Sequence, residues 1–176
     1  VLTHTFWNPE SKNNQTQTPL CCLWKTLPAK GSLHIHLGGW YRDVITDAVL
    51  GDLSEADLIL ALKKRQDFEE MLSLEGIVIL KFGLYLSASA QKKRLMAEAK
   101  LNDRWGDQHR KLVLEKREDF LKIAEQVMLQ NDVRSYAPWH IIESDCSRYR
   151  DVTVGKTIAE AMLHTAQWHE AWRKDA

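Results

Sequence analysis

The chain has 176 residues and a mass of 20.4 kDa, the size of one ordinary domain. Hydrophobic residues make up 44% and charged residues 27%, a globular composition that excludes disordered, collagen-like and disulfide-scaffold chains. No apolar run approaches the roughly 20 residues that a membrane-spanning helix needs, so we expect no membrane contact. Three cysteines are too few for a disulfide framework, which predicts a reducing compartment, the cytoplasm.

The 24 basic and 24 acidic side chains balance, but their distribution is uneven. The stretch from Lys81 to Arg117 holds ten basic and four acidic residues, a net charge of +6. A basic block in a neutral chain favours a site for an anionic ligand over a general nucleic-acid surface. The alternative is a solvated helical surface. Because Val1 already reads as part of a strand, we expect the chain to begin inside a longer polypeptide.

Strand and helix patterns alternate along the chain. The expected strands cover residues 1–7, 32–37, 77–82 and 139–143. The expected helices cover residues 19–27, 40–50, 54–73, 87–100, 107–130 and 147–172. Ser54 begins one helix with a capping-box pattern and Gly51 ends the preceding one. In the last helix we expect an inward face, formed by Val154, Ile158, Ala161, Met162, Thr165 and Trp168. The alternation predicts an α/β sandwich with a mainly parallel sheet.

Ligands of such sheets bind outside the carboxyl ends of the strands. The expected ends are Leu37-Gly38-Gly39, Lys81-Phe82 and Glu143-Ser144-Asp145. Lys81 is therefore a candidate ligand-binding residue, the alternative being a strand-end lysine that reaches solvent. Arg94, Arg104 and Trp105 follow in a basic helix–break–helix segment that could close over a phosphate chain as a lid.

Three other patterns do not predict chemistry. Gly155-Lys156-Thr157 resembles the end of a phosphate-binding loop. However, Arg150 occupies the position where that motif requires an earlier glycine, and the stretch lies within a helix pattern. His34 and His36 share one strand face, but no third zinc ligand is nearby. Cys21 and Cys22 are adjacent and read as small hydrophobic residues.

Several motifs, in the same order, resemble the polyphosphate kinase 2 family, most of all the polyphosphate:AMP phosphotransferase type that carries two such domains in tandem. They are Gly39-Trp40-Tyr41, residues 75–82 (EGIVILKF), Leu86-Ser87, residues 91–95 (QKKRL), residues 137–143 (APWHIIE) and Arg148-Tyr149-Arg150. The resemblance covers about residues 23–165. It implies a P-loop kinase-like three-layer fold, and magnesium-dependent phosphoryl transfer between inorganic polyphosphate and nucleotides (AMP or ADP) by the parent protein. Residues 87–130 correspond to a helical lid-like segment.

The resemblance also implies where this chain departs from the family. The family's phosphate-binding loop and first strand would precede Val1, so we expect residues 1–176 to form a domain that is incomplete at its N-terminus. The family's metal-binding aspartate is replaced by Leu37, and a second lid arginine by Glu98. Leucine has no oxygen ligand for magnesium, so we expect no metal bound by this chain. The positions that match the family's binding residues are Asp47, Lys81, Arg94 and Arg104.

This pattern resembles the degenerate first domain of the tandem enzymes. The leading hypothesis is a non-catalytic domain that packs against a second, catalytic domain of the same family and retains some polyphosphate binding. A second hypothesis is an active domain whose phosphate-binding loop lies upstream. A third is an unrelated α/β interaction domain. A homo-oligomer is possible under each hypothesis, and no nucleic-acid partner is expected.

Overall fold

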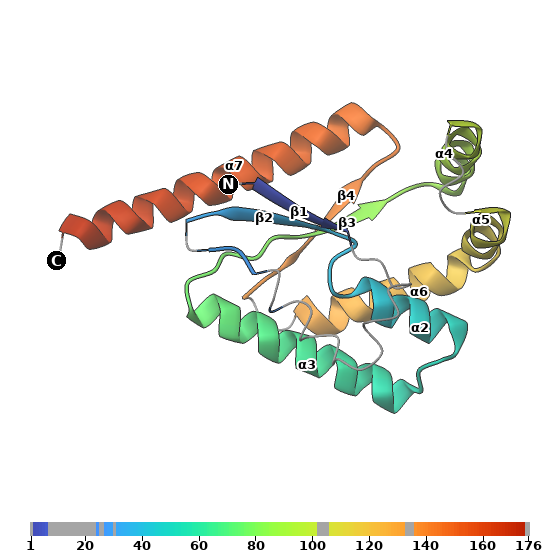
Figure 1. Cartoon of the computed structure of the whole chain (residues 1–176), viewed down its shortest axis with the longest axis horizontal. Coiled ribbons are helices and arrows are strands. Elements are labelled where there is room, and N and C mark those ends of the chain that lie inside the picture. The colour runs from blue at the N-terminus through green and yellow to red at the C-terminus, as the bar shows by residue number, and fades with distance from the viewer. Residues whose placement is uncertain are drawn as a thin grey trace. The chain divides into compact units, whose positions relative to one another are not determined.

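The computed structural model describes residues 2–6, 24, 27–29, 31–101, 106–132 and 136–174. Its strands are β1 (Leu2–Phe6), β2 (Leu33–Leu37), β3 (Lys81–Tyr85) and β4 (Trp139–Glu143) (Figure 1). Its helices are α2 (Arg42–Leu50), α3 (Glu55–Leu74), α4 (Ala88–Leu101), α5 (Gly106–Glu115), α6 (Arg117–Asp132) and α7 (Ser147–Lys174). None of these described helices is long and apolar enough to cross a membrane.

Both strand pairs are parallel, as the alternation of strands and helices predicted. β1 pairs with β2, from Leu2 opposite Leu33 to Phe6 opposite Leu37. β3 pairs with β4, from Lys81 opposite Trp139 to Tyr85 opposite Glu143. Parallel pairing needs a long crossover connection, and α4, α5 and α6 lie in the one that joins β3 to β4.

The chain divides into two units, each with its own strand pair. The first comprises Val1–Asp67 and Asp119–Val127, and the second Phe68–Glu118 and Met128–Ala176. α3 and α6 each contribute residues to both units. The buried side chains of the first unit include Tyr41, Val44, Leu58, Leu62 and Val127, and those of the second Phe68, Leu72, Ala137 and Ile142.

The helix boundaries in the first unit follow local signals. α2 ends at Gly51, which adopts the left-handed conformation with φ of 82°. The Ser54 hydroxyl caps α3 by accepting a hydrogen bond from the Asp57 backbone N–H at 3.2 Å, and it donates to the Asp57 carboxylate at 2.6 Å. Both features were predicted from the sequence.

The predicted strand over residues 77–82 is displaced in the structure. β3 begins only at Lys81 and continues to Tyr85, so the apolar residues 77–80 precede the strand. The displacement follows from the partner, because β4 begins at Trp139, which lies opposite Lys81. Gly83 allows this pairing, since a Cβ there would lie 2.9 Å from Ile141 Cδ1. The pairing register with β4, rather than the apolar run, therefore determines where β3 begins.

Three further expectations need correction or lie outside the described residues. The single helix predicted over residues 107–130 is two helices, α5 and α6, because the chain turns at Lys116. Met162 was expected to face inward on α7, but its side chain is exposed. Most of the predicted helix over residues 19–27 lies outside the described residues.

Candidate functional site

The carboxyl tip of β2 is apolar. Leu37 ends the strand and is 44% exposed. Gly38 and Gly39 then turn the chain with positive φ angles of 91° and 57°. Trp40 and Tyr41 lead into α2, and Tyr41 is buried. No oxygen-bearing side chain comes from the tip itself, although ligands of parallel sheets bind at this end.

Two charged groups near this tip, Arg65 and Asp43, are bound to one another. Arg65 of α3 is buried and donates to the Trp40 carbonyl oxygen at 2.5 Å and to the Ala61 carbonyl oxygen at 3.0 Å. Its remaining terminal nitrogen forms an ion pair with Asp43 Oδ2 at 3.0 Å. Arg65 therefore fixes the Gly39-Trp40 turn against α2 and α3. Arg65 could not be singled out from the sequence, because nothing in its spacing distinguishes it from an exposed helical arginine.

A magnesium ion does not fit these residues. The tip offers Leu37 and two glycines, and the nearby Asp43 carboxylate already neutralises the Arg65 guanidinium, a cation that repels a second one. Asp43 Oδ1 is buried and makes no hydrogen bond, but a single carboxylate oxygen supplies little of the six-oxygen shell of magnesium. Within the described residues, no group of three or more His, Cys, Asp or Glu side chains could hold a metal ion.

Asp47, the acidic position matched to the family, lies on α2 in the first unit. Partial burial raises the pKa of its carboxyl group, and the neighbouring carboxylates Asp43 and Asp52 raise it further, against the Arg65 guanidinium, which lowers it. Asp47 is thus in an acidic environment that disfavours its charge.

The imidazoles of His34 and His36 lie side by side on β2, with ring centroids 4.3 Å apart. The edge of Trp40 lies against His36 at 5.6 Å. Burial lowers the pKa of His36, and the adjacent His34 lowers it further. The neutral form of His36 is therefore favoured where its ring packs against Trp40.

A polar cluster joins the carboxyl ends of β3 and β4 in the second unit; we call its members Ser87, Arg94, Arg117 and Asp145 the strand-end cluster. Arg94 of α4 donates to the carbonyl oxygens of Ser144, at 2.5 Å, and Asp145, at 3.1 Å. Asp145 Oδ1 accepts the backbone N–H of Ser87 at 2.8 Å. Arg117 donates to the Leu86 carbonyl oxygen at 2.6 Å.

The electrostatics of the strand-end cluster favour the charged carboxylate. Hydrogen bonds from Ser87 lower the pKa of Asp145, and the guanidinium groups of Arg94 and Arg117 lower it further. The Ser87 hydroxyl also caps α4 by accepting the Ala90 backbone N–H at 3.2 Å. The cluster therefore ties the loops that follow both strands to α4 and α6. Ser87 was predicted as the first residue of the helix over residues 87–100 and in the Leu86-Ser87 motif, and Arg117 only as part of the basic block.

Lys81 lies at the opposite end of the strand pair from Arg94, and this corrects the prediction that it ends a strand. It is the first residue of β3, only 6% of its side chain is exposed, and its ammonium group lies 2.7 Å from Glu69 Oε2. The same ammonium group lies 5.1 Å from the ring centroid of Trp139. The structure therefore separates two residues that were expected to share a site. Arg104, the fourth candidate, and Trp105 lie outside the described residues.

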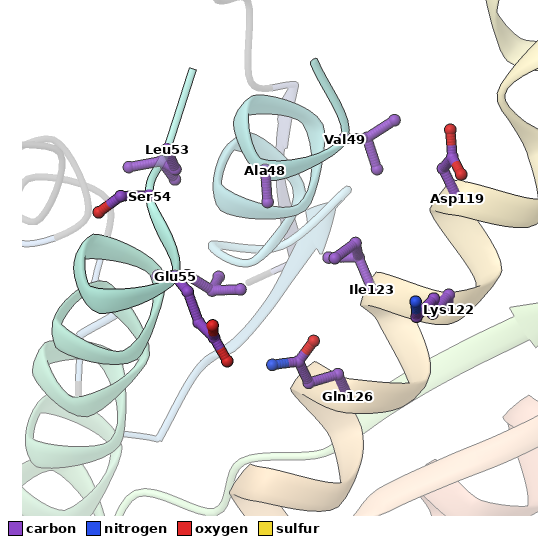
Figure 2. Close-up of a pocket in the computed structure, with 10 residues that line it drawn as sticks. Ala48, Val49, Leu53, Ser54, Glu55, Asp119, Lys122, Ile123 and Gln126 are labelled. Atoms are coloured by element: carbon purple, nitrogen blue, oxygen red, sulfur yellow. The ribbon is translucent and has the colours of Figure 1, made fainter. Parts of the chain in front are cut away.

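A shallow cleft in the first unit lies apart from these residues (Figure 2). Its volume is about 350 Å³, and residues of α2, the start of α3 and α6 line it. Ala48, Val49 and Ile123 supply apolar walls, and Glu55 and Gln126 point toward each other across it (Figure 2). Neither Asp47 nor Leu37 lines the cleft, so it does not extend the strand-tip site.

Comparison with solved structures defines the class of fold. The chain superposes on polyphosphate kinase 2 from Arthrobacter aurescens TC1 with a TM-score of 0.85 at 22% identity, covering 93% of this chain and 58% of that one. This likeness and the parallel strand pairs confirm the predicted α/β, P-loop kinase-like fold.

Comparison of sequences identifies the family. The model of the family "Polyphosphate kinase 2 (PPK2)" matches residues 3–170. Polyphosphate:AMP phosphotransferases from Pseudomonas aeruginosa and Pseudomonas syringae pv. tomato are each 35% identical to the chain, over 167 and 150 residues. These alignments cover 92% and 82% of this chain but 33% and 29% of the relatives. The chain therefore belongs to the polyphosphate kinase 2 family and spans about a third of the length of these relatives. Membership excludes the hypothesis of an unrelated interaction domain.

Proposed function

We propose that this chain is a non-catalytic domain of a polyphosphate-dependent nucleotide phosphotransferase of the polyphosphate:AMP type. It stabilises a second domain of the same family and holds polyphosphate on the exposed lysines of α4. The family match and the names of the relatives support the substrate class. We also propose that it acts in the cytoplasm, which the low cysteine content supports.

The observation that carries the proposal is the apolar tip of β2. Phosphoryl transfer depends on positioning and on cationic stabilisation of the phosphate oxygens, for which this family would use magnesium. The family resemblance puts Leu37 at the position of the metal-binding carboxylate, and the Asp43 carboxylate is engaged with Arg65. Loss of one such stabilising group typically costs a factor of about 10² to 10³ in rate.

We assign polyphosphate binding to lysines that are exposed to solvent, not to cations that already bind other groups of the protein. Lys92 and Lys93 are adjacent and exposed on α4, within the basic block. Arg94 instead binds backbone carbonyl groups, and Lys81 is buried against Glu69. We therefore assign Arg94 and Lys81 structural roles, and the contact with the polyanion to Lys92 and Lys93.

A direct assay tests the catalytic part. The full chain is incubated with AMP, magnesium and long-chain inorganic polyphosphate, and ADP formation is measured against an active polyphosphate:AMP phosphotransferase. We expect no ADP above the enzyme-free background. Sustained turnover by the chain would contradict the proposal and favour an active domain with an altered metal site.

A binding assay with a matched control tests the other part. The double variant Lys92→Glu/Lys93→Glu should lose at least about tenfold in affinity for polyphosphate, because cationic contacts dominate polyanion binding. The control Lys63→Glu/Lys64→Glu makes the same charge change at an exposed lysine pair on α3 and should change affinity less than about twofold. Equal losses in both variants would refute a site on α4.

A further inference from the structure

Both ends of the segment that carries α4 and α5 are attached at the carboxyl end of the β3–β4 pair. The segment leaves the strand pair after Leu86 and returns at Arg117, the first residue of α6. Arg117 donates hydrogen bonds to the Leu86 carbonyl oxygen at 2.6 Å and to the Gln91 amide oxygen, so it joins the end of the segment to its start. Lys92 and Lys93, the exposed lysines of α4, come directly after Gln91 on this attached part of the helix.

Asp145 anchors the start of α4 from a position 58 residues after Ser87 in the chain. Its Oδ1 atom accepts the backbone N–H of Ser87 at 2.8 Å, and the Ser87 hydroxyl in turn accepts the Ala90 backbone N–H at 3.2 Å. The first turn of α4 contains no acidic residue of its own. A carboxylate near the N-terminus of a helix stabilises it through the N–H groups and the helix dipole. Asp145 therefore supplies, from the loop after β4, a group that the sequence of α4 lacks.

The anchored part of α4 contains Lys92 and Lys93. Before them Asp145 holds Ser87, and directly after them Arg94 donates to two backbone carbonyl oxygens of the loop after β4, at 2.5 and 3.1 Å. A helix of 14 residues is only marginally stable in water on its own, so a start that is no longer anchored unwinds more readily. A polyanion contacts several cations at once, and cations that are already fixed lose less conformational freedom when it binds.

We propose that Asp145 is a positioning residue for polyphosphate binding, which holds the start of α4 so that Lys92 and Lys93 form a fixed cationic pair. This inference rests on the proposed function, because it concerns how the lysines of α4 are presented to the polyanion. It predicts the opposite of what charge alone predicts. Asp145 is exposed and negative, so loss of its charge would by electrostatics alone strengthen the binding of a polyanion. A weaker affinity after its removal therefore indicates lost positioning.

Equilibrium binding of long-chain inorganic polyphosphate to the full chain tests the proposal. Asp145→Ala removes both the charge and the acceptor, and should lower the affinity about threefold or more, as expected for the loss of one hydrogen bond. Asp145→Asn keeps an acceptor for the Ser87 N–H and should recover most of that loss. The matched control Glu143→Ala removes the same charge from an exposed side chain at the end of β4, and should leave the affinity unchanged or raise it less than about twofold. Equal affinities of Asp145→Ala and Glu143→Ala overturn the proposal, as does an Asp145→Asn variant that binds as weakly as Asp145→Ala.

Hydrogen exchange of the backbone amides gives a second readout, which a general loss of stability does not reproduce. In Asp145→Ala the amides of residues 88–93 should exchange about fivefold faster, while those of α3 keep their wild-type rates. Faster exchange in both helices would show a global effect and overturn the positioning role. The proposed function fails in a different way, because Lys92→Glu/Lys93→Glu would then bind polyphosphate like the wild-type chain. The present inference fails when that double variant loses affinity and Asp145→Ala does not.

Discussion

Residue scale: the pair formed by Lys81 and Glu69 is buried on both sides, with 6% of each side chain exposed. A buried charge is tolerated only when it is matched, and here the carboxylate at 2.7 Å and the Trp139 ring provide that match. A lysine at the margin of an apolar run can be either a ligand contact or one half of an internal pair. Lys81 forms the internal pair, because it is the first residue of β3 and its ammonium group lies against Glu69.

Removing one member of this pair should therefore destabilise the protein. Lys81→Ala leaves the Glu69 carboxylate buried without its cation, and should lower the free energy of unfolding by about 3–5 kcal/mol. Lys81→Met/Glu69→Leu removes both charges and should recover most of that loss. Urea denaturation measures both variants. If Lys81→Ala has no effect on stability but abolishes polyphosphate binding, Lys81 is a ligand contact after all.

The lowered pKa of His36 predicts that the stability of the fold depends on pH. Burial and His34 hold its pKa below the unfolded value of about 6.5, so the unfolded chain binds more protons as the pH falls through that value. The melting temperature should therefore fall between pH 8 and pH 5.5. His36→Gln should reduce the fall, and His34→Gln should reduce it less, because burial is the larger cause. Parallel curves for all three proteins would contradict this reading.

Element scale: two glycines in helical surroundings have opposite roles. Gly51 ends α2 in the left-handed conformation, with φ of 82°, where a side chain is strained. Gly155 lies inside α7 in open space with an ordinary helical backbone. The same substitution should therefore change stability in opposite directions at the two positions.

Gly51→Ala should lower the free energy of unfolding by about 1–2 kcal/mol, because alanine resists the left-handed conformation. Gly155→Ala should raise it by about 0.5–1 kcal/mol, because alanine favours the helix. Thermal and urea denaturation of the two variants measure the difference. A stabilising Gly51→Ala would mean that the α2 terminus relaxes to another cap.

Whole-molecule scale: the chain is neutral, yet the basic block around α4 and α5 carries a local charge of +6. Exposed lysines in this block favour electrostatic attraction of a polyanion, whereas Arg94 and Arg117 are engaged with backbone carbonyl groups. Binding without a specific pocket depends on the number of phosphate groups in contact.

The affinity for polyphosphate should therefore depend on salt and on polymer length. We expect at least a tenfold loss between about 50 and 200 mM salt, and weaker binding of tripolyphosphate than of long chains. Isothermal titration calorimetry at several salt concentrations measures both effects. The Lys92→Glu/Lys93→Glu variant should show a shallower salt dependence, and salt-independent binding would refute a purely electrostatic mode.

The sequence alone determined the features that depend on neighbouring residues or on the order of motifs. It predicted the family, the alternation of strands and helices, and the Gly51 and Ser54 boundaries. These predictions succeed because caps, periodicity and motif residues are local properties of the chain.

Only the tertiary structure decided which groups meet. It placed β3 four residues later than the apolar run, because the register of a parallel ladder depends on a strand nearly 60 residues away. It divided α5 from α6 and bound Arg94 and Arg117 to backbone carbonyl groups, and it moved Lys81 to the far end of its strand. Charge and composition cannot distinguish an arginine that holds a loop from one that holds a phosphate, since the difference lies in what surrounds the side chain.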